Sequence, residues 1–378
     1  MYDYIFAGAG CAALSLVYKM NQLPEFQDKK ILLIDKTPKN QNDRTWCFWT
    51  QEPTAFEKIV SKTWEKIYFH APPFEKVIPT TPYRYQMIRS IDFYEFILKN
   101  LSKNPNITWL YGNISQLYSD KRAAYVQVEG NTYQTKWAFN SLFAHQNPNP
   151  NKYHYLLQHF KGWLIETPQP TFNENIPTFM DFSIDQHHET RFMYILPHSP
   201  TRALVEFTLF SKKILTQEQY ENQIQEYLKG KYHLTNFSIL EKEFGIIPMT
   251  NMPFQQKHSP RIINIGTQGG YTKASTGYTF MNIQRKTDKI LQNLIRKNQP
   301  FFRQPLYNRF RLYDATLLDV LARNRYEGKE IFRIMFEKHP LTRIFRFLDE
   351  QSHFWEELQI MASMPTFTFS KAFLSQMF

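Results

Sequence analysis

The first 35 residues carry the pattern that most restricts how this chain can fold. A strand-like run, Tyr2–Ala7, leads into the glycine segment Gly8-Ala9-Gly10, and an apolar stretch with helical spacing follows. The next strand-like run, Ile31–Asp35, is continuously apolar and ends in an acid. This order is typical of the β-α-β unit that binds dinucleotides, with Ala13 in the third glycine position. We therefore predict an α/β protein with a Rossmann-like N-terminal part.

Three residues of this unit have a physical role toward a bound dinucleotide. Gly8 permits the sharp turn after the strand, and Gly10 lets a pyrophosphate approach the helix N-terminus, where unpaired N–H groups favour an anion. Asp35 is placed to accept hydrogen bonds from a ribose. The chain has only 12 glycines, and six of them lie in the segments Gly8–Gly10 and Gly266–Gly277. This concentration makes both segments candidates for ligand contact.

The second glycine segment again follows a strand-like run, Arg261–Ile265, and we expect a helix to start around Thr276. The segment resembles the second FAD-contacting motif of flavoproteins related to p-hydroxybenzoate hydroxylase. Among them it is most similar to the loop of lycopene cyclases, a glycine-rich turn followed by Ser/Thr-Gly-Tyr. The resemblance implies that FAD is contacted by four glycines, Gly266, Gly269, Gly270 and Gly277.

Two positions in this segment depart from the wider flavoprotein pattern. Thr267 stands where many of these proteins carry Asp, and Ala274 stands where Pro is common. The missing Asp removes a contact to the ribityl chain that the wider family would predict, although the cyclase branch often lacks it.

The middle of the chain contains three strand-like runs, Phe179–Phe182, Arg191–Leu196 and Arg202–Phe210. They are rich in aromatic and aliphatic residues and are separated by Pro, His and Ser. This is typical of antiparallel strands, which we assign to a substrate domain. Together with Pro197–Arg202, these runs resemble the central region of bacterial lycopene β-cyclases.

Glu206 is the main candidate for acid–base chemistry. It matches the first acid of the Glu-Glu/Asp-Thr signature of that family, while Phe207 stands in place of the second. Strand alternation puts Glu206 on the same face as Leu204, Thr208 and Phe210, where a lone carboxylate is costly unless it is paired or protonated. Burial would raise its pKa, which suits a general acid or base acting on an apolar substrate.

Other interpretations of the acidic residues stay open. Glu206 would be an ordinary salt-bridge residue if Arg202 or Arg191 were its partner. Asp181, on the neighbouring strand-like run, is the second candidate catalytic acid. Its alternative is a hydrogen-bonded carboxylate of the core or of a turn.

Two arginines are candidates for the cofactor site. The segment Asp43–Trp49 resembles a Thr-Trp segment of the cyclases after their second strand, and Arg44 within it is placed to reach the cofactor. Arg89 lies near the start of an expected helix, Asp92–Asn100, and related flavoproteins use an arginine there on the FAD pyrophosphate. A surface ion pair is the alternative for each.

The C-terminal part of the chain is basic. The chain carries a net charge of +11, and Arg285–Arg346 holds 15 basic and 6 acidic residues. Its charges alternate with apolar residues, as in Ile331–Phe336 and Ile344–Leu348, which is compatible with docking on anionic lipid. The alternative is a solvated helical face whose apolar stripe packs inward. No apolar run approaches the ~20 residues that span a bilayer.

These patterns predict a Rossmann-like FAD-binding domain, a second domain with an antiparallel sheet, and a helical C-terminal region. Two cysteines without metal-ligand spacing predict neither a disulfide scaffold nor a metal site, and the N-terminus has no signal-peptide pattern, so we expect a cytoplasmic protein in peripheral contact with membrane lipid. The expected boundaries are 1–60, 83–165 and 245–285 for the FAD-binding domain, 61–82 and 166–244 for the substrate domain, and 286–378 for the basic helical region.

The resemblance implies the activity of a lycopene β-cyclase, with Glu206 as acid or base. Lycopene would be converted without net oxidation to γ-carotene and then β-carotene. The cofactor would be FAD in its reduced form, with NAD(P)H as electron donor, and no nucleic acid is expected as a partner. The alternatives are an FAD-dependent monooxygenase or isoprenoid reductase, and a membrane-binding protein that keeps FAD only as structure.

Overall fold

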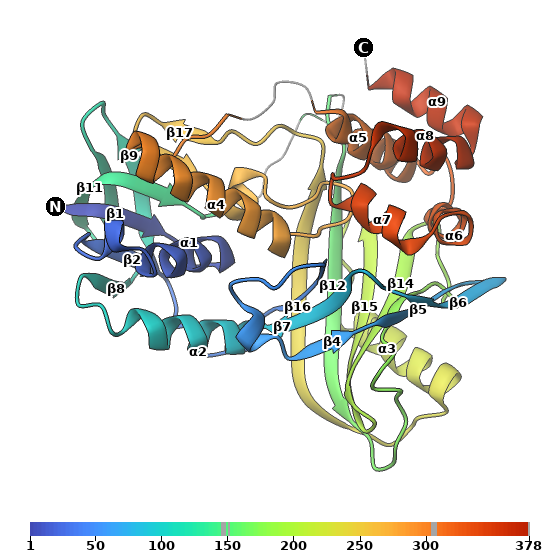
Figure 1. The fold of residues 1–378 in the computed structure, drawn as a ribbon. Helices are drawn as coiled ribbons and strands as arrows, with labels where there is room; N and C mark the ends of the chain where they lie inside the picture. The colour runs from blue at the N-terminus through green and yellow to red at the C-terminus, as the bar shows by residue number, and fades with distance from the viewer. Residues whose placement is uncertain (145–148, 150–151, 304–307, 377–378) are drawn as a thin grey trace.

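The computed structural model describes residues 1–144, 149, 152–303 and 308–376 (Figure 1). In it the N-terminal β-α-β unit forms as the sequence predicted. Strand β1 (Tyr2–Ala7) is followed by helix α1 (Cys11–Asn21) and strand β2 (Ile31–Asp35). β1 pairs in parallel with β2 on one side and with β11 (Asn131–Asn140) on the other. The α/β class and the Rossmann-like part are thereby confirmed.

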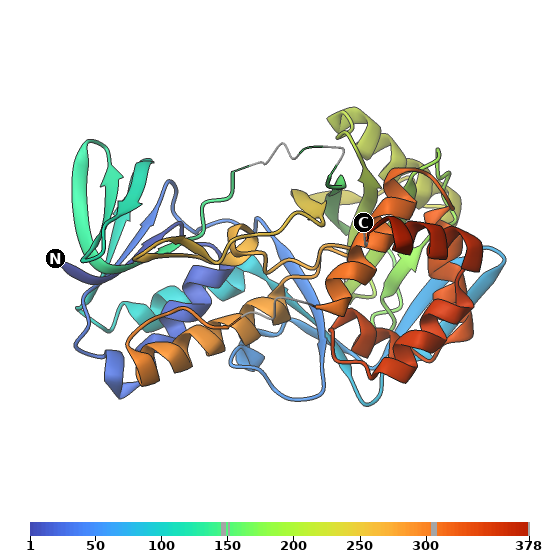
Figure 2. The same cartoon turned by 90° about the horizontal axis from the view of Figure 1, so that it is seen from above.

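The first sheet has the order β17-β18-β11-β1-β2-β8, with a hairpin of β9 and β10 attached to β11. Helices α1, α2 (Ser90–Leu101) and α4 (Phe280–Lys297) pack on one face of this sheet, and the hairpin packs over the other (Figure 2). The remaining strands of this sheet are β8 (Ile107–Tyr111), β9 (Ile114–Ser119), β10 (Ala124–Val128), β17 (Lys257–Ser259) and β18 (Ile262–Asn264).

The second sheet has seven strands in the order β16-β12-β15-β14-β13-β5-β6 and is antiparallel except where β13 meets β5. The three strands predicted in the middle of the chain are its centre, β13 (Thr178–Asp181), β14 (Thr190–Ser199) and β15 (Arg202–Ser211). The others are β5 (Lys66–Ala71), β6 (Phe74–Pro79), β12 (Tyr155–Glu166) and β16 (Ser238–Thr250).

Helices cover both faces of this second sheet (Figure 1). Helix α3 (Gln217–Tyr232) packs on one face, against a row of β15 that includes Val205 and Phe207. The C-terminal helices pack on the opposite face, toward which Leu204 and Phe210 point. They are α5 (Arg309–Ala322), α6 (Gly328–Lys338), α7 (Leu341–Leu348), α8 (Phe354–Ser363) and α9 (Thr366–Ser375).

A small third sheet joins the two parts, with β7 (Arg84–Arg89) between β3 (Thr45–Thr50) and β4 (Lys62–Trp64). Because side chains alternate along a strand, β3 contributes to two cores at once. Phe48 packs with the α1, α2 and α4 core, whereas Trp49 packs with the core beneath the C-terminal helices.

The sheets correct the predicted domain boundaries. Residues 155–165 and 245–250, expected in the FAD-binding domain, lie in β12 and β16 of the seven-stranded sheet. Residues 286–297, expected in the C-terminal region, belong to α4, which packs on α1 through Lys19 and Asp288 (2.6 Å). The sequence could not show this because an amphipathic helix does not identify the surface that it will cover.

Helix α4 also begins later than expected, at Phe280 rather than around Thr276. Gly277 has a positive φ of 75°, and the N–H of Lys273 bonds to the carbonyl of Tyr278, so the glycine segment continues as a loop. A backbone with positive φ does not continue a right-handed helix.

The apolar residues of the basic runs are packed inward, as in the alternative given above. Ile331, Phe332, Ile344 and Phe345 are buried, and neighbouring cations pair with acids, as Arg346 does with Glu356. Within the described residues, no helix is long and apolar enough to cross a membrane.

Candidate active site

A cleft of about 430 Å³ lies where the two glycine segments meet the seven-stranded sheet. Gly10 reaches it from the start of α1, and Gly266 and Gly277 reach it from the second glycine segment. Strands β12, β14, β15 and β16 supply the opposite wall, which includes Glu206. Folding thus brings both glycine segments together with strands from the middle of the chain.

The first glycine segment leaves room at the helix N-terminus. Gly8 has φ of 90°, and an added Cβ would lie 2.8 Å from Ser141 Oγ, so the turn requires glycine. At Gly10 an added Cβ would be 3.9 Å from its nearest neighbour, so this position is open. Asp35 accepts a hydrogen bond from the N–H of Ala9 (2.8 Å) and does not line the cleft. Ala13 is fully buried within α1.

The second glycine segment divides into lining and turn residues. Gly266 and Gly277 line the cleft with positive φ, and a Cβ at Gly277 would lie 2.2 Å from Gln158 Oε1. Gly269 and Gly270 do not line it. A Cβ at Gly269 would come within 2.5 Å of the Asn264 carbonyl oxygen, so this glycine serves the turn.

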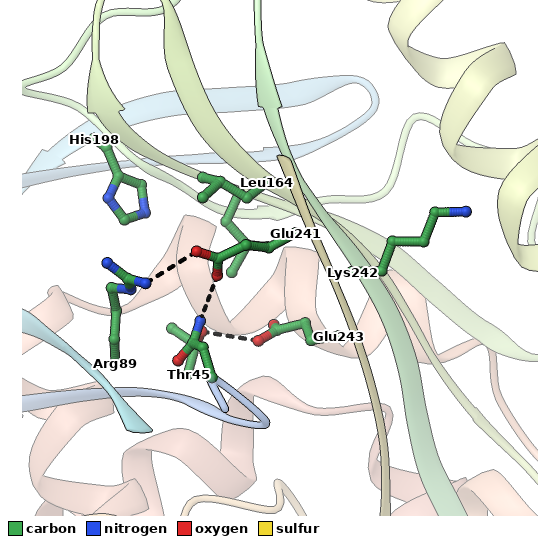
Figure 3. Close-up of a pocket in the computed structure, with 9 residues that line it drawn as sticks. Thr45, Arg89, Leu164, His198, Glu241, Lys242 and Glu243 are labelled. Atoms are coloured by element: carbon green, nitrogen blue, oxygen red, sulfur yellow. Dashed lines mark hydrogen bonds and ion pairs between the residues drawn. The ribbon is translucent and has the colours of Figure 1, made fainter. Parts of the chain in front are cut away.

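The two arginines have different surroundings. Arg44 lines the cleft, and its guanidinium donates to the carbonyl of Phe244 (3.2 Å). Arg89 lies in a small separate pocket and pairs with Glu241 (3.0 Å), as Figure 3 shows. The structure therefore brings Arg44, but not Arg89, to the cleft that the glycine segments line. Arg89 as a contact of the pyrophosphate stays a prediction, and its observed partner is the ion pair given as the alternative.

Glu206 lies on β15 with its exposed part in the cleft. Thr208 on the same face donates a hydrogen bond to Glu206 Oε1 (2.6 Å). The salt-bridge alternative does not hold, because Arg202 pairs with Glu166 (2.6 Å) and Arg191 with Glu189 (2.6 Å). Among the described residues, no ion pair includes Glu206.

A second carboxyl group, Glu243, lies beside Glu206. Glu206 on β15 and Glu243 on β16 are both paired with Gly162 of β12, so the two side chains meet across the central strand. A Cβ at Gly162 would be 2.9 Å from Glu243 Cγ, so the absent side chain leaves room for this meeting. Thr45 donates to Glu243 Oε2 (2.9 Å), which Figure 3 shows.

The two carboxyl groups titrate as a coupled pair. Burial and the charge of Glu243 raise the pKa of Glu206 well above its ordinary value. Burial also raises the pKa of Glu243, but hydrogen bonds from Thr45 and Glu206 and the charge of Arg44 oppose the rise. Glu243 Oε1 is buried without another partner in the described part of the chain. The larger rise lies at Glu206, so Glu206 is the member of the pair that more strongly favours the protonated form.

Aromatic residues and a cysteine line the cleft together with Glu206. Cys47, Tyr85, Tyr194 and Tyr278 line the same cleft. Burial raises the pKa of Tyr278 and that of Tyr194 well above the ordinary tyrosine value, so both phenols stay neutral. Neutral phenol rings therefore share the cleft with Glu206.

The sequence interpretation missed Glu243. In the run Glu241-Lys242-Glu243 the alternating charges resemble a solvated strand face. The sequence does show that Glu241 and Glu243 are alternate residues, four and two positions before Gly245, and so lie on the same face of a strand. Only the strand pairing shows that this face meets Glu206.

Asp181 lies away from the cleft. Its buried carboxylate accepts hydrogen bonds from Tyr227 (2.7 Å) and the Ser183 N–H (2.9 Å) and lies beside His70 (2.9 Å) and Lys231 (3.3 Å). Burial would raise its pKa, but the Ser183 and Tyr227 hydrogen bonds and the Lys231 charge lower it. This is the hydrogen-bonded core carboxylate given as the alternative, and the carboxyl that Glu206 meets is Glu243.

Comparison with known proteins identifies the family. The family model described as lycopene cyclase protein matches residues 3–374. The chain belongs to the lycopene cyclase family. The match includes both glycine segments and both carboxyl groups, Glu206 and Glu243.

Curated relatives within this family agree. The chain is 25% identical to the lycopene beta-cyclase of Pantoea ananas over 299 residues, which cover 74% of this chain and 71% of that protein. It is 29% identical to the lycopene beta-cyclase of Paracoccus sp. (strain N81106 / MBIC 01143) over 133 residues, 32% of each chain.

Solved structures show that this lycopene cyclase family member has the fold of flavoproteins. A flavoprotein/dehydrogenase from Cytophaga hutchinsonii superposes with a TM-score of 0.66 at 9% identity, covering 99% of both chains. A geranylgeranyl bacteriochlorophyll reductase-like protein from Thermoplasma acidophilum has a TM-score of 0.60 at 11% identity, covering 98% of both. A flavin-dependent halogenase from Xanthomonas campestris has a TM-score of 0.58 at 10% identity, covering 99% of this chain and 94% of that one.

Proposed function

We propose that this chain is a lycopene β-cyclase that converts the ψ ends of lycopene to β-ionone rings, first to γ-carotene and then to β-carotene. The observation that carries the proposal is Glu206 in a cleft lined by both glycine segments, with the Glu243 carboxyl beside it at the edge of the small adjoining pocket. A neutral carboxylic acid is able to protonate an alkene, and a neighbouring carboxylate compensates the charge that the acid then acquires.

The residues at the cleft fit FAD. The open position at Gly10 and the free N-terminal turn of α1 suit a pyrophosphate. Arg44 adds a positive charge at this wall, and the lining glycines Gly266 and Gly277 allow close approach of a planar group. FAD in its reduced form, with NAD(P)H as electron donor, would supply negative charge and electron density near a cationic substrate without being consumed.

The chain's own residues can supply the proton that the substrate gains and accept the proton that it loses. Glu206 Oε–H gives its proton to the terminal double bond, and the resulting tertiary cation is attacked by the double bond that closes the six-membered ring. The ring carbon then loses a proton to the Glu206 carboxylate, which leaves a β-ionone end and the acid in its starting form. Glu243 accepts a hydrogen bond from Thr45, and the charge of Arg44 favours its ionised form against the effect of burial.

The aromatic wall stabilises positive charge on the substrate. Tyr85, Tyr194 and Tyr278 are neutral rings beside Glu206, and the face of an aromatic ring attracts a cation. The same wall excludes water, which would otherwise add to the cation.

Peripheral contact with membrane lipid is part of the proposal, at a different place from the basic runs. Five exposed large apolar residues of the described chain lie on α8 and α9, among them Trp355 (74% exposed) and Phe367 (84% exposed). Such side chains insert at a bilayer interface, where lycopene dissolves. We expect the double variant Trp355→Ser and Phe367→Ser to float less with liposomes. Equal flotation of both forms would remove these residues from the contact.

The test of the activity is anaerobic incubation of the protein with lycopene and chemically reduced FAD in heavy water. A cyclised product that carries deuterium but no added hydrogen pair and no oxygen is the expected result. A product heavier by a hydrogen pair would indicate an isoprenoid reductase, and one that needs oxygen a monooxygenase. Bound flavin with unchanged lycopene would indicate a membrane-binding protein.

A further inference from the structure

A second cavity, of about 440 Å³, lies among the C-terminal helices. It is distinct from the cleft that contains Glu206, and its walls come from α5, α6, α7, α8 and α9. The lining is dominated by aliphatic, aromatic and methionine side chains, among them Leu317, Phe332, Met361 and Met364. These residues form no charged or polar centre that would recognise a polar ligand.

The one carboxylate at its edge is already neutralised. Asp314 pairs with the buried Lys273 (2.8 Å) and accepts a hydrogen bond from Ser275 (2.7 Å). Lys273 in turn reaches Glu350 (3.1 Å). The cavity therefore offers an apolar surface, and the ligand that gains most from it is a long hydrocarbon chain.

The cavity adjoins the cleft through a single residue. Thr276, in the second glycine segment, lines both spaces. Its Oγ1 is buried without a hydrogen-bond partner among the described residues, so no side-chain hydrogen bond fixes Thr276 in place between the two spaces. At the other end, Thr366, Ser370 and Leu374 of α9 line the cavity and are exposed, so it opens at the surface beside Phe367.

We propose that this cavity holds the chain of an acyclic isoprenoid while its ψ end lies at Glu206. The inference rests on the proposed function, because it assigns the part of the substrate that the cleft does not contain. The flexible methionines Met361 and Met364 allow the lining to adapt to a chain with or without a ring at its far end. The exposed mouth on α9 lets the chain enter and leave lengthwise, which is needed if both ends are to react in turn.

The test fills the cavity without touching the carboxyl pair. Met361→Trp on α8 and Leu317→Trp on α5 place bulk in the cavity from two sides. Leu358→Trp is the matched control, because Leu358 lies on α8 but is exposed and does not line the cavity. The protein carrying reduced FAD is assayed with lycopene and with a short polyene that bears the same ψ end.

Both cavity variants are expected to raise KM for lycopene about ten-fold or more, because each methylene-sized group kept out of an apolar site weakens binding about four-fold. Turnover of the short polyene should stay within about two-fold of wild type, and the Leu358→Trp control should behave as wild type with both substrates. Circular dichroism induced in the visible band of bound lycopene gives a second readout that needs no turnover.

Two results separate this inference from the proposed function. If both cavity variants bind and cyclise lycopene as wild type does, the cavity does not hold the chain and the inference falls, while the cyclase activity stands. If wild type cyclises neither substrate, the proposed function falls. The induced dichroism then still decides whether the cavity binds the polyene, since only the cavity variants should lose it.

Discussion

Replacing each member of the carboxyl pair separately should produce two different pH profiles. Glu206→Gln keeps the size of the side chain and leaves a neutral amide that can donate to Glu243, but it removes the transferable proton. Glu243→Gln leaves Glu206 in place and removes the adjacent charge that, after burial, raises its pKa. The first change removes the acid, and the second alters only how readily the acid ionises.

The magnitude follows from what else lines the cleft. Positioned acid–base groups contribute about 10²–10⁴ in rate, or about 2.7–5.4 kcal/mol. The other acid that lines the cleft in the described chain is Asp43, which is exposed and bonded to Tyr94 (2.9 Å). Glu243 lies beside Glu206 but does not line the cleft, so we expect Glu206→Gln to lose about 10³–10⁴ in turnover at every pH.

The second variant, Glu243→Gln, is expected to shift the pH profile rather than to lower turnover equally at every pH. Without the Glu243 charge the pKa of Glu206 falls, so Glu206 ionises at lower pH and the alkaline limb of the rate profile moves to lower pH. At acidic pH, where Glu206 is protonated in both proteins, the loss should be about ten-fold or less.

The assay is anaerobic turnover of lycopene with reduced FAD across the pH range, with flavin content and thermal unfolding as controls for folding. Both Gln variants should retain flavin and unfold within a few degrees of wild type. Retention of more than about a tenth of wild-type turnover by Glu206→Gln would refute its role as the acid. An unmoved alkaline limb in Glu243→Gln would refute the coupling between the two groups.

Three further predictions concern packing, cofactor and pH. Gly162→Ala should lower turnover at least about ten-fold and cost about 1–3 kcal/mol in stability, because its Cβ would press on Glu243 and Leu204. Gly230→Ala, with nothing within 4 Å, should do neither; turnover and urea unfolding measure both effects. Gly10→Val should weaken flavin binding about ten-fold or more by filling the open position. Arg202→Ala, which breaks an exposed ion pair outside the cleft, should leave flavin binding unchanged; fluorescence titration of flavin would contradict this if the two results were reversed. Burial lowers the pKa of His159 from 6.5 to about 4, so the folded state holds this imidazole neutral. The protein should therefore lose up to about 3 kcal/mol of stability as pH falls from 6.5 toward 4. Urea unfolding of His159→Gln should show a smaller loss over this pH range.

Much of the fold and part of the site were predictable because their signals are local. The strand, glycine turn and helix at Tyr2–Asn21 form as expected, since backbone freedom at Gly8 and apolar periodicity act within a few residues. Glu206 could be placed on an apolar face by alternation alone. Domain boundaries were less predictable, because the sequence of β12 is that of an apolar strand, which does not indicate the sheet to which the strand belongs.

The sequence by itself determined which residues are able to do chemistry, and the tertiary structure decided which of them meet. Alternation and resemblance identified Glu206, but its partner Glu243 is 37 residues away and reaches it only because β15 and β16 flank β12 at Gly162. Asp181, as plausible an acid in the sequence, is held by Tyr227 away from the cleft. Strand register is set by the packing of whole faces, so no local pattern contains it.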